Sequence, residues 1–244
     1  MPNTENHVVT AAPNKRNKPI SQPQFKPTQG LLTWGVEGTE GGPSHSRVLS
    51  VPTPQSGATI GRGYDMRHKS KQKIISDLTK ARLNLADAEK LSNLNGKFGD
   101  DAKKEISKLG LQQFELPDHV QKNLFDISFS EEKKEVKRIS GSKAAVEKYG
   151  QVDWDRVNPE IIDIVIDLKY RGDYTPHTRA HIQKYIVNND LDGLNRVLQD
   201  RELWRNVPLD RFRQRKAYSE NAIKKRDAES LKNRLTANIP SRMP

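Results

Sequence analysis

Carboxyl and hydroxyl side chains gather in two short blocks in the first third of the chain. The first block is Glu37-Gly38, and the second runs from Ser56 to Asp65 and reads SGATIGRGYD. Two carboxyl groups held close together are the minimum that acid–base cleavage of a glycosidic bond needs. A hydroxyl such as that of Thr59 can hold a water molecule beside them. The residue types therefore predict glycoside hydrolysis, provided that the fold brings the blocks together.

Each group has an expected role. Glu37, at the end of a short helix and near apolar groups such as Trp34, would have its pKa raised by desolvation and would donate a proton to the leaving oxygen. Asp65, closer to solvent, would stay ionised and act on a water or on the oxocarbenium-like centre. Glu40, which also precedes a glycine, is an alternative proton donor. We favour Glu37 because it keeps the context of a helix followed by glycine.

Further residues are expected to contact the substrate. Gly61 and Gly63 would let a bulky sugar approach the strand backbone, and Tyr64 belongs to the same block. Arg211 or Arg215 would touch a substrate carboxylate or a peptide stem. These arginines alternate with Arg213 at two-residue spacing. We therefore expect them to fan out around their helix and not to form one patch.

The elements that must position these residues can be predicted from periodicity. Residues 29–37 favour a short helix, and 46–51 and 57–64 favour two strands joined by a proline-containing turn. From Ser70 the pattern is helical almost to the end. The clearest helix covers 159–170, with Asn158 as N-cap and Pro159 in the first turn. The other helices are expected to begin near 70, 84, 100 and 117 and to cover 178–187, 192–198 and 208–222.

The two blocks resemble the pesticin-type muramidase domain, a lysozyme module similar to the phage T4 lysozyme fold. The family pattern is Glu-Gly near the end of a first helix and then, about twenty residues later, S/G-G-x-T-I-G/A-x-G-[YF]-D, which residues 56–65 match at almost every position. Residues 167–173 and 204–215 look like the family's later helices. The resemblance covers about residues 29–225 and is most specific over 31–66.

The resemblance implies an α+β, mainly α fold, with a small helix-plus-hairpin subdomain, a larger helical lobe and a sugar-binding cleft between them. It implies hydrolysis of the β-1,4 bond between N-acetylmuramic acid and N-acetylglucosamine in peptidoglycan, with Glu37, Thr59 and Asp65 as the catalytic set. It implies no cofactor or metal. The proteins that carry this domain are bacteriocins and cell-wall-degrading secretion effectors, so an acidic immunity protein is an expected partner.

Composition predicts how the chain is divided. Residues 1–27 are rich in proline and polar side chains and are expected to form a flexible basic arm. Residues 28–226 would form the lysozyme-like domain, and 227–244 a polar tail. A mean hydropathy of −0.86 and a hydrophobic content of 33% fit a chain of 244 residues that is partly unpacked.

Charge and leader signals bear on partners and location. The formal net charge of +11 favours a polyanionic partner such as nucleic acid, anionic lipid or bacterial cell wall. There is no cysteine, and His177 and His181 have metal-ligand spacing without an evident third ligand, so no metal site is expected. The sequence has no run of about 18 apolar residues, so membrane insertion is not expected. The first residues do not read as a secretory signal, so we expect synthesis in the cytoplasm and secretion-system or phage-type delivery to the periplasm or wall of a target bacterium.

Two other functions compete with the hydrolase. A basic nucleic-acid-binding protein on a lysozyme-like fold would show steep salt dependence and indifference to Glu37→Gln. A non-catalytic wall-binding module would explain the charge equally well, although the intact Glu, Thr and Asp set argues against it.

Overall fold

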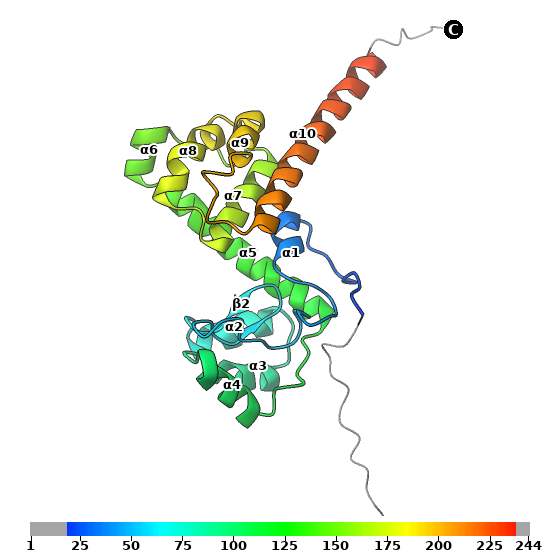
Figure 1. The fold of residues 1–244 in the computed structure, drawn as a ribbon, viewed down its shortest axis with the longest axis vertical. Helices are drawn as coiled ribbons and strands as arrows, with labels where there is room; N and C mark the ends of the chain where they lie inside the picture. The colour runs from blue at the N-terminus through cyan, green and yellow to red at the C-terminus, as the bar shows by residue number, and fades with distance from the viewer. Residues whose placement is uncertain (1–18, 238–244) are drawn as a thin grey trace, which may run out of the picture. The chain divides into compact units, whose positions relative to one another are not determined.

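The computed structural model describes residues 19–237, which contain ten helices and one two-stranded antiparallel sheet (Figure 1). The predicted α+β, mainly α class is therefore confirmed. Within these residues no helix is both long enough and apolar enough to span a bilayer.

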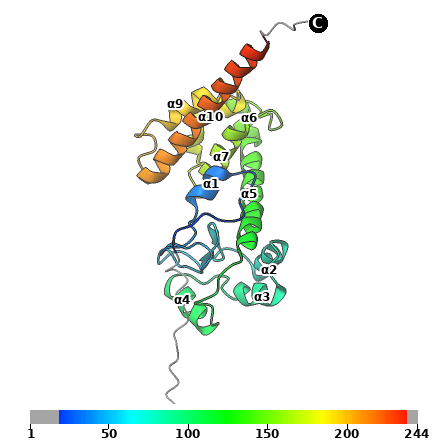
Figure 2. The ribbon, with the colours of Figure 1, turned by 90° about the vertical axis from the view of Figure 1, so that its right-hand side faces the viewer.

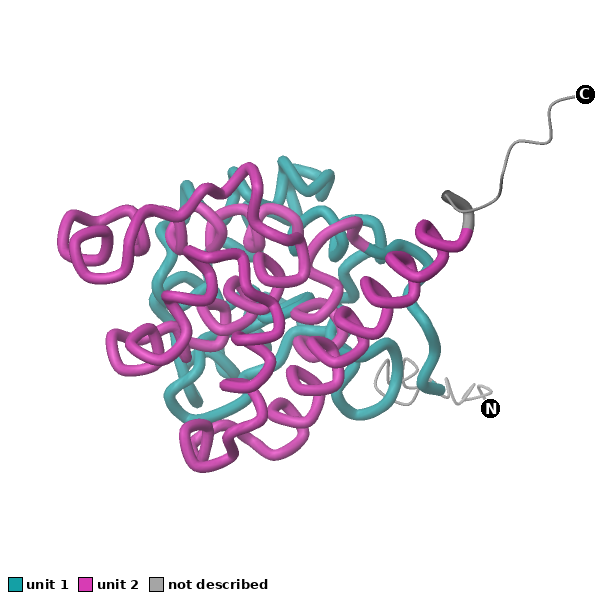
Figure 3. The backbone as a smooth tube through the Cα atoms, turned by 90° about the horizontal axis from the view of Figure 1, so that it is seen from above, with its two compact units in different colours: residues 1–26, 38–125 teal, residues 27–37, 126–244 magenta. Residues whose placement is uncertain are grey.

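The chain divides into two compact units, coloured separately in Figure 3. Unit 1 comprises the described residues 19–26 together with 38–125, and unit 2 comprises 27–37 together with 126–237. Helix α5 (Asp118–Ser140) begins in unit 1 and ends in unit 2. Because the cut falls after Glu37, Glu37 belongs to unit 2, whereas Gly38 and the second block belong to unit 1.

Unit 1 holds a small hairpin and three helices. Strand β1 (Thr59–Ile60) pairs with β2 (Tyr64–Asp65), and α2 (Lys71–Lys80), α3 (Leu85–Ser92) and α4 (Gly99–Lys108) follow. The side chain of Ser70 caps α2 by accepting a hydrogen bond from Lys73 N. The core of this unit includes fully buried apolar side chains from these elements and from residues next to them, namely Ile60, Met66, Ile74, Leu78, Leu91 and Leu94.

The predicted strand at 46–51 is wrong as a regular strand. Residues Val48 and Ser50 make only single bridges, to Glu115 and Thr59. The hairpin instead lies wholly within the second block, where Gly61 and Gly63 have φ of 64° and 84°. Two glycines in the left-handed region allow the chain to reverse within residues 61–63, so both strands come from 59–65.

Unit 2 is a helical bundle. It contains α1 (Leu31–Val36), the second part of α5, α6 (Lys143–Tyr149), α7 (Pro159–Arg171), α8 (Pro176–Val187), α9 (Leu191–Leu198) and α10 (Leu209–Ala237). Helix α7 is central, as predicted: its apolar side chains are fully buried, namely Ile161, Ile164, Val165, Ile166 and Leu168. Helix α1 packs against α7 and α10 (Figures 1 and 2). Helix α6 was not predicted as a separate helix.

Ordered structure extends past both expected ends of the domain. Helix α10 continues to Ala237, past the expected boundary at residue 226. Part of the expected arm, Ser21 to Phe25, is held to unit 1: Ser21 N donates to Glu40 O (3.0 Å), and Gln24 N donates to Asp118 Oδ2 (2.7 Å). Residues 1–18 of the arm and 238–244 of the tail lie outside the described residues.

Candidate active site

Glu37 is the C-cap residue of α1, and its backbone N–H donates to Thr33 O (2.9 Å). The other end of this helix has no side-chain cap of its own. Instead, Asp163 of α7 accepts hydrogen bonds from Gly30 N (3.1 Å), from the backbone of Leu31 and from the Tyr218 hydroxyl of α10 (2.9 Å). The helix that carries Glu37 is therefore positioned by two other helices of unit 2.

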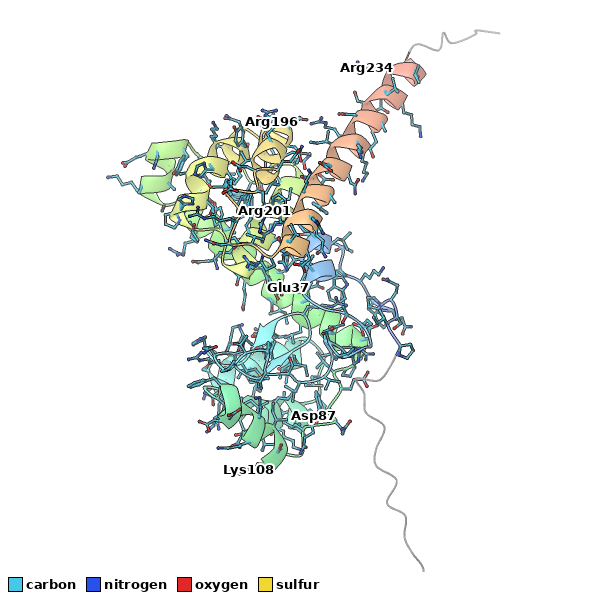
Figure 4. All side chains as sticks on the ribbon, in the orientation of Figure 1. Glu37, Asp87, Lys108, Arg196, Arg201 and Arg234 are labelled. Carbon is cyan, nitrogen blue, oxygen red and sulfur yellow. The ribbon has the colours of Figure 1, made fainter. Side chains whose placement is uncertain are left out.

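The Glu37 side chain meets an arginine of α10. Arg211 Nη2 lies 2.8 Å from Glu37 Oε1, and the same nitrogen lies 2.6 Å from Asp167 Oδ1 of α7. Asp167 is fully buried, whereas the Glu37 side chain keeps 21% of its surface exposed. Figure 4 labels Glu37 at the end of α1, beside the beginning of α10. One guanidinium nitrogen is thus shared between a buried carboxylate and an accessible carboxyl group.

Burial raises the pKa of Glu37. The positive charge and hydrogen bond of Arg211 oppose this effect, while the negative charge of Asp167 adds to it. Tyr170 of α7 belongs to the same environment: burial, followed by the negative charge of Glu37, raises the pKa of its phenol. The protonated form of Glu37 therefore persists to higher pH than that of an exposed glutamate, which is the property of a general acid.

Arg211 and Arg215 converge, contrary to the expected fan. They lie four residues apart on α10 and both bind Asp167; Arg215 Nε donates to Oδ2 over 2.6 Å. Arg215 Nη1 also contacts Asp173 Oδ2 at 2.6 Å, and Arg171 Nη1 contacts the other oxygen at 2.5 Å. The Arg215 side chain is only 3% exposed and already paired, which leaves it little surface for the predicted substrate contact. Arg211, at 9%, likewise contacts Glu37 and Asp167.

Glu40 is surrounded very differently from Glu37. Its side chain is 3% exposed and contacts Arg47 Nε (2.8 Å) and Arg62 Nη2 (3.1 Å), and Gln121 Nε2 donates to it (2.7 Å). Burial favours the protonated form, yet the hydrogen bonds from Gln121 and Arg47 and the nearby positive charges hold the pKa of Glu40 below its usual value. A buried carboxylate of this kind is a poor proton donor, so the alternative to Glu37 loses its support.

In unit 1, Thr59 and Asp65 are directly opposite each other in the β1–β2 register. Directly opposed residues of an antiparallel pair project from the same face of the sheet. Asp65 Oδ2 accepts from Gly57 N (3.1 Å), and Oδ1 accepts from Arg67 N (2.7 Å). Two backbone donors fix the carboxyl group, and both Asp65 and Thr59 remain partly exposed. The structure thus brings together the hydroxyl and carboxyl groups that the second block predicted.

The glycines of the second block are explained by the protein itself. A Cβ atom at residue 57 would overlap with Asp65 Oδ1 and would lie 2.6 Å from Arg67 Cβ. Gly61 and Gly63 form the turn of the hairpin. Tyr64 is buried and its hydroxyl donates to Asp77 Oδ2 over 2.8 Å, which leaves its side chain little surface for the predicted substrate contact. These residues shape the hairpin that presents Thr59 and Asp65.

Unit 2 also contains a cavity of about 570 Å³ lined by residues of α8 and of the segment before α10, including Asp173, His177, His181 and Trp204. The two imidazole rings lie 5.2 Å apart. Across residues 19–237, no group of three or more His, Asp or Glu side chains is arranged to hold a metal ion.

Sequence reasoning missed Asp163, Asp167 and Asp173, the acidic partners on and just after α7. The signal available was weak: Asp163 and Asp167 are polar residues within a helix that is otherwise apolar nearly all round.

Comparison with known proteins assigns the chain to a family. No curated protein matches the chain. A family model described as a domain of unknown function, DUF8812, matches residues 30–216, a span that includes Glu37, the second block and both arginines of α10. The chain therefore belongs to the DUF8812 family.

Proposed function

We propose that this protein is a muramidase that hydrolyses the β-1,4 bond between N-acetylmuramic acid and N-acetylglucosamine in peptidoglycan. The observation that carries the proposal is the environment of Glu37, a partly exposed carboxyl group whose pKa is raised by burial beside a shared arginine. A general acid of a glycosidase needs this combination of access and proton affinity.

Glu37 would give its proton to the glycosidic oxygen as the bond to the anomeric carbon breaks. Asp65 would either take a proton from the attacking water or stabilise the positive charge that develops at that carbon. The hydroxyl of water completes the new reducing end, so the atoms of one water are divided between the two products. Thr59, opposite Asp65 in the hairpin, would hold the water. The support in unit 1 is the partly exposed pair of hydroxyl and carboxyl groups on one face.

We also propose that the protein acts as an antibacterial toxin or effector on the wall of a target bacterium. Its net charge of +11 suits adsorption to an anionic wall, and an immunity protein that blocks it would be acidic for the same reason.

The experiment is digestion of purified sacculi by wild type, Glu37→Gln and a control variant, Glu229→Gln, on the exposed part of α10. Mass analysis of the soluble products should find reducing N-acetylmuramic acid ends with wild type and the control. Glu37→Gln should lower the rate by about 10³-fold or more, because it removes the general acid. Absence of release by folded wild type would overturn the proposal and favour a binding function for wall or nucleic acid.

The hairpin is tested separately. Thr59→Ala and Asp65→Asn should each lower turnover by about 10²-fold or more in a folded protein. Asp65→Asn should also lower the melting temperature modestly, because its NH2 group cannot accept from one of the two backbone amides that Asp65 binds. Wild-type rates in either variant would contradict the assigned roles. The anomer released by wild type then tells whether Asp65 acts on water, which inverts the configuration, or on the sugar, which retains it.

A further inference from the structure

A chain of alternating charges leads away from Glu37 into unit 2. It runs from Glu37 to Arg211, Asp167, Arg215 and Asp173, with successive contacts of 2.8, 2.6, 2.6 and 2.6 Å. The middle members are almost completely buried: Asp167 is 0% and the Arg215 side chain 3% exposed. Only the two ends of this chain, Glu37 and Asp173, reach partial exposure.

A buried aspartate paired to two arginines costs desolvation energy, and an apolar side chain could fill the same space. Asp167 nevertheless has a specific effect, because it orients the guanidinium of Arg211. Both of its oxygens accept from the Arg211 guanidinium, over 2.6 Å at Nη2 and 3.4 Å at Nε. These two bonds fix the plane of the guanidinium and leave its Nη2 to contact Glu37 Oε1.

We propose that Asp167 and Arg215 are positioning residues that hold Arg211 against Glu37 and set the net charge that Glu37 faces. The inference rests on the proposed role of Glu37 as general acid. An Arg211 without a counter-charge would bind ionised Glu37 strongly and would remove its proton. Asp167 takes up part of that positive charge, and Arg215 in turn moderates Asp167. The negative charge of Asp167 accordingly raises the pKa of Glu37, and the positive charge of Arg215 lowers it.

The other groups around Glu37 come from the two helices that pack on α1. Helix α7 contributes Tyr170, which is neutral at physiological pH, and Asp163 at the far end of α1. Helix α10 contributes Arg211, Arg215 and the hydroxyl of Tyr218. The carboxylate of Glu132 on α5 acts on Tyr170 and is itself paired with Lys169 at 2.7 Å. Two buried charges therefore act on the Glu37–Arg211 pair. Asp167 contacts Arg211 directly, and Arg215 contacts Asp167.

The test compares two variants that should shift the pKa of Glu37 in opposite directions. Asp167→Asn keeps the shape and removes the negative charge, so the pKa of Glu37 should fall. Arg215→Gln removes a positive charge, so the pKa should rise. The measurement is the carboxyl carbon titration of ¹³C-labelled glutamate in the full chain, with the Glu37 signal identified by its loss in Glu37→Gln. Asp192→Asn, which removes an Asp–Arg pair on the surface of α9 and α10 at 2.6 Å, is the matched control and should shift nothing.

Activity supplies the second readout. For Asp167→Asn the alkaline limb of the kcat/KM profile on sacculi should move to lower pH, with a loss about tenfold greater at pH 8 than at pH 5. For Arg215→Gln the limb should move to higher pH. A merely structural role would lower activity equally at all pH values, and that result would overturn the proposal, as would unchanged titration of Glu37 in both variants.

Failure of the positioning role can be distinguished from failure of the proposed muramidase activity. If Asp167→Asn does not fold, Asp173→Asn tests the same idea at the partly exposed end of the series of charges. It removes a negative charge from Arg215, so the net positive charge near Glu37 rises and the pKa of Glu37 should fall. Inactivity of wild type on sacculi would refute the muramidase, whereas the titration tests the positioning role whether or not sacculi are cleaved.

Discussion

Two glutamates three residues apart show how local partners, and not burial alone, decide the chemistry of a carboxyl group. Glu40 has three donors, two of them charged, and its pKa falls despite deep burial. Glu37 has one guanidinium nitrogen, which it shares with Asp167, and its pKa rises. The first arrangement stabilises a carboxylate, and the second keeps a proton available.

Their amide variants should therefore differ in stability. Glu40→Gln should lower the free energy of unfolding at pH 7 by about 3–5 kcal/mol, because it removes the buried carboxylate that contacts both Arg47 and Arg62. Glu37→Gln should leave stability unchanged or slightly higher at this pH, because ionising a group with a raised pKa opposes folding. Urea unfolding monitored by circular dichroism measures both, and equal losses in the two variants would contradict this difference.

The pH dependence has a definite sign. The pKa of Glu40 is lower in the folded than in the unfolded chain, so its contribution to stability is present above the unfolded value of about 4.3 and is lost as pH falls through the folded value. The pKa of Glu37 is raised, so its relative contribution is present below the unfolded value and is lost as pH rises through the folded value.

Gly57 is a residue at which one methyl group should disturb the site. In Gly57→Ala the new Cβ would overlap with the Asp65 carboxylate, which must move away from the Gly57 and Arg67 amides. We expect turnover on sacculi to fall by about 10²-fold, as for displacement of a catalytic group by about 1 Å. Wild-type turnover in Gly57→Ala would show that the exact place of Asp65 is unimportant.

At the scale of elements, α1 is the least autonomous helix described. It has six residues, no side-chain N-cap and an exposed glycine at position 35. Its position depends on Asp163 at one end and Arg211 at the other. A helix this short has little stability of its own.

Gly35→Ala tests this view of α1 and serves as the control for Gly57→Ala. A Cβ at residue 35 would meet no atom within 4 Å. Alanine should therefore stabilise the protein by about 0.5–1 kcal/mol through helix propensity, without loss of activity. A thermal melt and a sacculus assay measure the two effects, and destabilisation would mean that α1 cannot accept an ideal helical backbone at this position.

Sequence patterns predicted elements well where the information is local. The apolar face of 159–170 and its Asn158-Pro159 start gave α7 almost to the residue, whereas the pairing of Thr59 with Asp65 was not predicted. The strand at 46–51 was misplaced because alternating side chains do not reveal that the glycines at 61 and 63 turn the chain so early. The convergence of Arg211 and Arg215 on Asp167 was missed because helix α10 must first be packed against α7, which is a tertiary and not a local property.

At the scale of the whole molecule, the last part of α10 extends beyond the domain that the family shares. The DUF8812 match ends at residue 216, whereas α10 continues to Ala237. Residues 224–235 are all exposed, and Figures 1 and 4 show this end of α10, marked by Arg234, projecting beyond the other helices of unit 2. Arg226 of α10 contacts Asp192 of α9 at 2.6 Å.

A chain that stops after Asp227 should therefore fold normally. Its free energy of unfolding should stay within about 0.5 kcal/mol of the full chain, since the removed side chains described here are exposed. Activity on sacculi should stay within about twofold. A chain that stops after Asp210, which loses Arg211 and Arg215, is the contrasting case and should lose both. A large loss in the longer truncation would assign the extension a role in the fold.

Because Asp163 caps α1, this helix can be fixed in place only after α7 has been synthesised and has folded. The Gly30 amide and its acceptor are 133 residues apart, and Arg211 comes later still in the chain. A nascent or threaded polypeptide carries the carboxyl group of Glu37 long before the groups that hold it have emerged and packed. In the proposed scheme such a chain has an ordinary, exposed glutamate and no acid catalyst.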